Sequence, residues 1–171
     1  MFDIFGYMET AAQINELAAN LKTEGDNKSI KALDKRKTEV LEKFPKIKTK
    51  YKKLSEKYSA AAGGYIIRPA KDAAEIVEEG RILHHCVGGD GYLRSHNDGR
   101  SFILFLRKAD KKDIPLITIE IRGEEIIQWY GAYDKKPNKR LIDAWLKTYT
   151  KELAKREKAP KKKSVKAAKT A

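Results

Sequence analysis

The chain has 171 residues, of which 41% are hydrophobic and 36% are charged, and its formal net charge is +13. A chain of this length can bury one substantial core, and no apolar run approaches the roughly 20 residues of a membrane-spanning helix. The lone cysteine, Cys86, excludes an internal disulfide and a metal site built from cysteines alone. The N-terminal residues lack a basic leader and a long apolar region, so we expect a cytoplasmic protein without a signal peptide.

The positive charge is spread unevenly along the chain. Residues 1–62 carry 13 Lys and Arg against 9 Asp and Glu, residues 63–146 carry 14 against 13, and residues 147–171 carry 10 against 2. The C-terminal segment can therefore attract polyanions, while the nearly neutral middle segment gives no such indication. The residues predicted to bind nucleic acid are Lys155, Arg156, Lys158, Lys161, Lys162 and Lys163.

Residues 1–62 are predicted to form a helical, Lys-rich arm. Apolar residues recur at three- and four-residue spacing over residues 10–21, 30–44 and 47–58. The third of these segments is a basic helix with an apolar stripe. It either docks through the stripe or serves as an anion-binding arm. The small and glycine residues at 60–64 mark a change in composition, so we place a domain boundary after residue 62.

Residues 63–153 are predicted to form the main domain, followed by a basic, disordered tail at 154–171. Residues 65–69 are extended, and Asp72 is a candidate N-cap for a helix ending near residue 83, with Glu75 as its capping-box partner. Gly99 is expected to end a short helix begun near Tyr92. Pro137 is expected to open a final helix.

Between these helices the periodicity changes to that of strands. Residues 102–106 are a continuous apolar run, typical of a strand covered on both faces, and residues 116–122 alternate. A three-residue loop at 123–125 matches apolar to apolar residues across a hairpin. The pairs predicted by this register are Ile121–Ile127, Glu120–Gln128, Ile119–Trp129 and Thr118–Tyr130. The fold class is therefore α+β, a small antiparallel sheet flanked by helices.

Polar chemistry is concentrated at His84, His85 and Cys86, directly before a glycine-rich stretch. A metal site would require His96 to fold back over adjacent side chains that point about 100° apart, and we predict no metal. A Cys–His nucleophile would need the histidine within hydrogen-bond reach and an orienting acid, which Glu120 or Asp90 could supply after folding. The structural alternative makes Cys86 a small buried hydrophobe and one histidine a core or cap residue.

The polar face of the predicted hairpin is the second candidate feature. The register aligns the side chains of Thr118, Glu120, Gln128 and Tyr130 on one surface. Such a row is either a pocket wall or the solvent-exposed face that antiparallel hairpins commonly have.

Three segments carry a resemblance to a known family: GGYIIRPAKDAAEIVEEGRILHHCVGGDGYL, GRSFILFLRK and PLITIEIRGEEIIQWYGAYDKKPN. In this order and spacing they resemble the PcfJ-like proteins of conjugative plasmids, phages and related mobile elements, over residues 63–153. The most specific positions are residues 85–87 with Tyr92, residues 106–107, residues 118–120 and Gln128. The resemblance implies an association with mobile-element genes but no reaction, cofactor or catalytic set. It favours a shared site built from His85, Cys86, Glu120 and Gln128.

Two functional hypotheses follow. The first is an accessory protein of a plasmid or phage, associated with nucleic acid through the basic helix and tail. The alternative is an enzyme acting on a nucleotide or protein substrate, with His85, Cys86 and Glu120 in its pocket.

Overall fold

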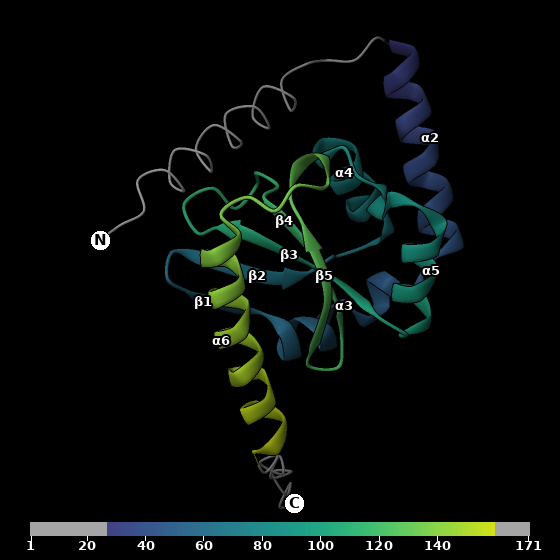
Figure 1. The fold of residues 1–171 in the computed structure, drawn as a ribbon. Helices are drawn as coiled ribbons and strands as arrows, with labels where there is room; N and C mark the ends of the chain where they lie inside the picture. Colours follow the sequence, from purple (N-terminus) through teal and green to yellow (C-terminus); the bar gives the residue numbers. More distant parts are fainter. Residues whose placement is uncertain (1–26, 160–171) are drawn as a thin grey trace, which may run out of the picture.

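Residues 27–159, which this computed structural model describes, form five α-helices, two short 3-10 helices and one five-stranded sheet (Figure 1). In chain order the elements are α2 (Asn27–Lys43), α3 (Lys46–Tyr58), β1 (Ala60–Ala62), β2 (Tyr65–Pro69), α4 (Ala73–Leu83), η1 (Cys86–Gly88), α5 (Asp90–Asp98), β3 (Phe102–Lys108), β4 (Ile117–Arg122), β5 (Glu125–Tyr130), η2 (Ala132–Asp134) and α6 (Lys139–Lys158). The disorder predicted from residue 154 is wrong for residues 154–158, which belong to α6. The helix predicted at residues 10–21 lies outside the described residues, and so do residues 160–171 of the predicted tail. Among those described, no helix is long and apolar enough to span a membrane.

The sheet is an antiparallel meander in which each strand pairs with the next along the chain, in the order β1-β2-β3-β4-β5. It is open, with β1 and β5 at its edges, and helices flank it (Figure 1). The α+β fold class is confirmed. The domain division after residue 62 stays a prediction, and it falls at the turn between β1 and β2.

Both faces of the central strand β3 are covered, because alternate side chains enter two different cores. Leu104 and Leu106 pack with residues of β4, α6 and the end of α3. Ile103 and Phe105 pack with residues of α2, α4, α5 and the start of α3. The continuous apolar run in β3 is thus explained as predicted.

The β4–β5 hairpin keeps most of the predicted register. Ile119 faces Trp129, Glu120 faces Gln128 and Thr118 faces Tyr130. The predicted Ile121–Ile127 pair is wrong, because Ile121 faces Ile126 and a register shift follows Glu120.

The shift has a local cause in the turn. Arg122 pairs with Glu125, so the turn has two residues rather than three, and Gly123 has the positive φ of 59° that a tight hairpin turn favours. The β-bulge then leaves Ile127 unpaired and 41% exposed. The offset is absorbed there, and Trp129 still faces the core.

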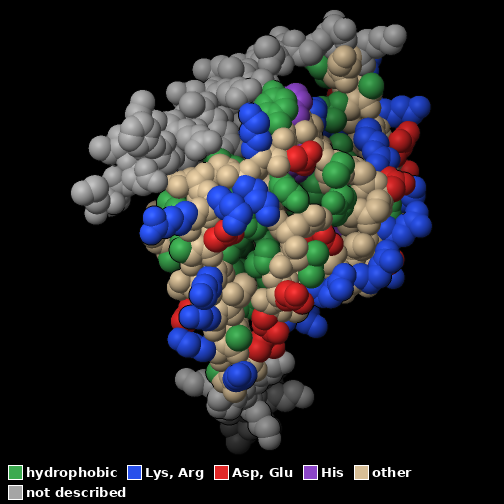
Figure 2. Space-filling view, in the orientation of Figure 1, with side chains coloured by type: hydrophobic (Ala, Val, Ile, Leu, Met, Phe, Trp, Pro, Cys, Tyr) green, Lys and Arg blue, Asp and Glu red, His purple; other side chains and the backbone are tan. Residues whose placement is uncertain are grey.

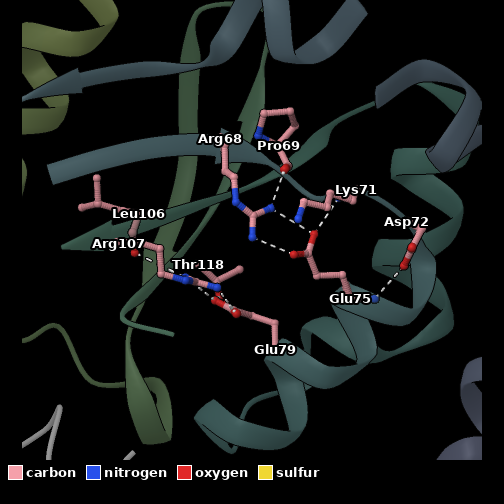
Figure 3. Close-up of polar contacts among 9 residues, drawn as sticks. All are labelled: Arg68, Pro69, Lys71, Asp72, Glu75, Glu79, Leu106, Arg107 and Thr118. Carbon is pink, nitrogen blue, oxygen red and sulfur yellow. Dashed lines mark hydrogen bonds and ion pairs between the residues drawn. The ribbon is translucent and has the colours of Figure 1, made fainter. Parts of the chain in front are cut away.

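Helix ends follow the capping signals with small differences. Asp72 accepts a hydrogen bond from the backbone N–H of Glu75 at 2.9 Å, as an N-cap should. The Glu75 carboxylate accepts a hydrogen bond from the backbone N–H of Lys71 at 2.7 Å rather than closing a capping box on Asp72. It also accepts hydrogen bonds from the guanidinium of Arg68 (Figure 3). Gly99, at φ 79°, follows α5 as predicted, but α5 begins at Asp90 and α6 at Lys139.

His96 is a buried histidine of α5 whose side chain packs against β3. Its Nδ1 accepts a hydrogen bond from the backbone N–H of Ile103 at 3.1 Å, and its ring lies edge-on to Phe102. Burial, with a smaller contribution from the charge of Lys50, lowers its pKa to about 4. The side chain is therefore neutral in the folded protein at neutral pH.

We expect His96 to make the folded state acid-sensitive. Its ring takes up a proton below about pH 6.5 in the unfolded chain but only below about pH 4 in the folded protein. The unfolded state thus binds more protons in this window, and stability falls as pH falls, by about 3 kcal/mol in total. Denaturant titrations at several pH values should show a shallower dependence for His96→Asn, which keeps an acceptor for Ile103. An identical pH dependence in both proteins would contradict this origin.

Candidate functional site

A pocket of about 300 Å³ lies between the polar face of β4 and β5 and the segment that follows α4. All four residues of the predicted site line it. The lining residues are His85, Cys86, Val87, Tyr92, Ile103, Thr118, Glu120, Gln128, Tyr130 and Asp134. The row of polar side chains predicted on the hairpin therefore forms a pocket wall.

Two glycines hold the His85–Cys86 segment against α4. A Cβ on Gly80 would lie 2.9 Å from the backbone N of Gly88, and a Cβ on Gly88 would lie 3.1 Å from the Cα of Val77. The backbones can approach this closely only without those side chains. His84 caps α4 with a left-handed backbone and stacks on the ring of Tyr133 at 4.7 Å between centroids. The turn so fixed carries His85 and Cys86 to the pocket.

Glu120 and Gln128 form the centre of the polar wall. Glu120 Oε2 accepts a hydrogen bond from Gln128 Nε2 at 2.8 Å, and its Oε1 accepts one from the Ser101 hydroxyl at 2.6 Å. Gln128 Nε2 also donates to the Tyr92 hydroxyl at 3.0 Å. Both amide hydrogens of Gln128 are thereby used, so its Oε1 is left as an acceptor. The contacts tie α5, β4 and β5 together.

His85 is held by a chain of hydrogen bonds that leads into the core. Its Nε2 lies 3.1 Å from the hydroxyl of Thr118, which in turn donates to Glu79 Oε1 at 2.9 Å. Glu79 forms a two-pronged ion pair with Arg107, and both are almost fully buried (Figure 3). Sequence reasoning missed Glu79, Arg107 and Ser101 as parts of this site.

The direction of this chain fixes the tautomer of His85. An ionised carboxylate only accepts, so the one hydroxyl hydrogen of Thr118 points to Glu79. The Thr118 oxygen must then accept from His85, which places a proton on Nε2. Burial lowers the pKa of His85, against the smaller opposing effect of the Glu79 charge, so neutral imidazole with a lone pair on Nδ1 is favoured.

Cys86 is exposed, so the structural alternative that made it a small buried hydrophobe is wrong. It is the first residue of η1, and with Val87 of the same element it lines the pocket. Its Sγ lies 4.0 Å from the hydroxyl of Tyr92. Cys86 is linked to Glu120 through the hydroxyl of Tyr92 and the amide of Gln128. His85 belongs to a different chain of contacts, which leads through Thr118 into the core. Within residues 27–159, no group of three or more His, Cys, Asp and Glu side chains is arranged to hold a metal ion.

The predicted nucleic-acid-binding residues divide between described and undescribed parts of the chain. Lys155, Arg156 and Lys158 are exposed in the last turns of α6, where Lys155 pairs with Glu152 and Arg156 donates to the Ser59 carbonyl. The residues outside the described range are Lys161, Lys162 and Lys163.

The exposed basic residues of α6 share one face. Neighbouring members are three, four or seven residues apart in the sequence, and residues at these spacings lie on the same side of an α-helix. The members of this basic face are Arg140, Lys147, Lys151, Lys155 and Lys158. They extend over roughly 27 Å of helix, and Figure 2 shows Lys and Arg side chains along the surface over α6.

Comparison with known proteins identifies a family and a curated relative. The family model described as PcfJ-like protein matches residues 8–146, so the similarity begins well before residue 63, where the sequence resemblance was placed. The uncharacterized protein Lin1253/Lin1744 of Listeria innocua serovar 6a is 30% identical over 125 residues. The match covers 73% of this chain but only 27% of the relative's length. No solved structure matches the chain.

Proposed function

This chain belongs to the PcfJ-like protein family, and we propose that it is a nucleic-acid-associated accessory protein of a plasmid or phage, acting in the cytoplasm. The observation that carries the proposal is the basic face of α6. Its cations all lie on one helix, and the sequence that follows this helix is also rich in Lys.

The arrangement suits sequence-independent contact with a phosphate backbone. Five cations over roughly 27 Å of helix run alongside about eight base pairs of duplex, each of which carries a phosphate on each strand. Lys147 and Lys151, one turn apart, are both exposed at the middle of the face. The Lys-rich helix α3 offers a further cationic surface, with exposed Lys48, Lys52 and Lys53.

The test removes charge from the face while leaving the helix intact. The triple variant Arg140→Gln, Lys147→Gln, Lys151→Gln should weaken binding to short duplex DNA and reduce the slope of log K against log salt by about 3. Fluorescence anisotropy at several salt concentrations measures both quantities. Deleting the segment after Glu157 should likewise weaken binding and flatten the slope.

A matched control carries the same change of charge elsewhere. Lys71, Lys111 and Lys112 are exposed and lie outside α6, so their triple replacement by Gln should leave most of the affinity and the slope. Equal losses in both triple variants would show that net charge, rather than the α6 face, attracts the nucleic acid, and the proposal would be wrong.

A second candidate function is an enzyme acting on a nucleotide or protein substrate. What favours it is the convergence of His85, Cys86, Glu120 and Gln128 on one pocket, with His85 held in a single tautomer by a buried carboxylate. A thermal-shift screen of nucleotides, metals and short oligonucleotides tests it. Stabilisation by a pocket ligand should be lost in Glu120→Gln and His85→Gln proteins that still fold. The same stabilisation in wild type and variants would argue for a structural cluster.

A further inference from the structure

The charge of the pocket is opposite to that of the chain. Of the ten described residues that line it, none is Lys or Arg, and two, Glu120 and Asp134, are acids. A phosphate placed inside would meet carboxylates without a compensating cation, at a high electrostatic cost. The interior is therefore suited to an uncharged or electron-poor group rather than to an anion.

The shape and surface of the pocket favour a flat heterocycle. Tyr92 and Tyr130 supply aromatic surface, and Val87 and Ile103 supply apolar surface. A volume of about 300 Å³ is at the small end of the range for ligand sites. A nucleobase with part of its sugar fits such a space, and bases stack on aromatic side chains whatever their sequence.

At the centre of the wall, Glu120 and Gln128 present acceptors. Gln128 uses both amide hydrogens on Glu120 and Tyr92, which leaves its Oε1 to accept. The carboxylate of Glu120 receives one donor on each oxygen and has further lone pairs. This pair of acceptors selects a ligand edge that donates. The exocyclic amino groups of cytosine and adenine are such donors, whereas uracil presents a carbonyl at the corresponding position.

A cation stands beside the pocket without lining it. Lys136 Nζ lies 5.0 Å from the ring centroid of Tyr130 and 5.1 Å from that of Trp129. Tyr130 lines the pocket, and Lys136 itself lines the neighbouring hollow with Trp129 and Asp143, so the ammonium and the pocket share the ring of Tyr130. A phosphate attached to a sugar at the mouth would meet this charge outside the acidic interior.

From these observations we propose that the pocket binds the amino-bearing base of a nucleotide, such as cytosine, and leaves the phosphate outside, beside Lys136. The proposal names a ligand class for the second candidate function and rests on it. It is independent of the basic face of α6. The nucleotide is either free or part of a single strand, because the pocket would recognise the same base in both.

The first experiment compares ligands and needs no variant. Titrations of ¹⁵N-labelled protein with cytidine and uridine, followed by NMR, should show cytidine binding about tenfold more tightly, because uridine sets a carbonyl against acceptors. Cytidine 5′-monophosphate should bind more tightly than cytidine. A competition between a short oligocytidylate and the mononucleotide separates the two sources. Tighter binding of the oligonucleotide, per nucleotide, assigns the site to a single strand, and tighter binding of the mononucleotide assigns it to the free nucleotide.

Variants then place the binding. Gln128→Ala should weaken cytidine binding about tenfold and reduce its advantage over uridine, whereas Glu125→Ala, on the same strand but outside the pocket, should not. Lys136→Gln should remove the advantage of the monophosphate and leave cytidine itself unaffected. The triple variant of α6 should bind cytidine normally, so failure of the pocket and failure of the α6 proposal are distinguishable.

Several results would overturn the proposal. The proposal would be wrong if neither cytidine nor adenosine, at millimolar concentration, changed the NMR chemical shifts of the pocket residues. Equal binding of cytidine and uridine would show that the amino group is not recognised. Displacement of cytidine by inorganic phosphate would place an anion inside the pocket. Tighter binding of a short arginine-containing peptide than of any nucleotide would identify a cationic side chain as the occupant.

Discussion

Replacing Glu79 with alanine is expected to destabilise the protein by about 3–5 kcal/mol, because it leaves Arg107 as an unpaired charge in the core. Glu79 is 2% exposed and Arg107 is 3% exposed. The guanidinium donates to Glu79 Oε1 at 3.0 Å and lies 4.8 Å above the ring of Phe105. Removing the carboxylate also takes away the acceptor of Thr118. Urea denaturation at neutral pH measures the loss.

The double variant Glu79→Leu, Arg107→Leu is the sharper part of this test. Removing both charges avoids the unpaired ion, so the double variant should be more stable than Glu79→Ala, although its charged network is gone. Glu39→Ala is the surface control, since Glu39 is 53% exposed and 3.9 Å from Lys35. Its change should stay within about 0.5 kcal/mol. A single variant no less stable than the double would show that unpaired Arg107 costs little, and the expected loss would be wrong.

The same variants report on the pocket. Thr118 donates to Glu79, and this fixes His85 with its proton on Nε2. Without the carboxylate, the Thr118 hydroxyl is free to donate to His85, and the other tautomer becomes accessible. The ¹⁵N chemical shifts of the His85 ring distinguish the two tautomers. The buried ion pair thus links core stability to the chemistry of His85.

The strands were predictable because their patterns are local and strong. Ile117, Ile119 and Ile121 alternate with polar residues, and a slip of one residue would move Ile119 away from Trp129 and set it opposite a polar residue. The same alternation is enough to align Glu120 with Gln128. The bulge at Ile127 was missed because a two-residue and a three-residue turn differ by one residue, and the choice depends on the backbone of Gly123.

The buried network behind the pocket was not predictable from local patterns. Glu79 and Arg107 lie 28 residues apart, and Arg107 appears in the sequence as the polar end of an apolar strand. Glu79 lies three residues after Ile76, on the inner side of α4, which was a signal that a charged residue faces the core. Its partner depends on how α4 crosses the sheet, which the helical period alone does not determine.

The second large effect is expected at Trp129, whose replacement by alanine should cost about 3–5 kcal/mol. The indole is 4% exposed and faces Ile119 across the hairpin. It packs in the same core as Ile142 and Leu146 of α6, and its Nε1 donates to Asp143 at 2.9 Å. The substitution therefore removes a large buried surface and the contact that holds α6 to the edge strand β5.

Two further variants separate the contributions of Trp129 and test the bulge. Trp129→Phe keeps an aromatic ring in the core and loses the bond to Asp143, so its cost should be clearly smaller than that of alanine. Ile127→Ala, two residues earlier on the same strand, should change stability by no more than about 0.5 kcal/mol, because the bulge turns Ile127 toward solvent. In the unbulged register Ile127 would face Ile121, which is fully buried. A cost at Ile127 comparable to that at Trp129 would therefore favour the unbulged register.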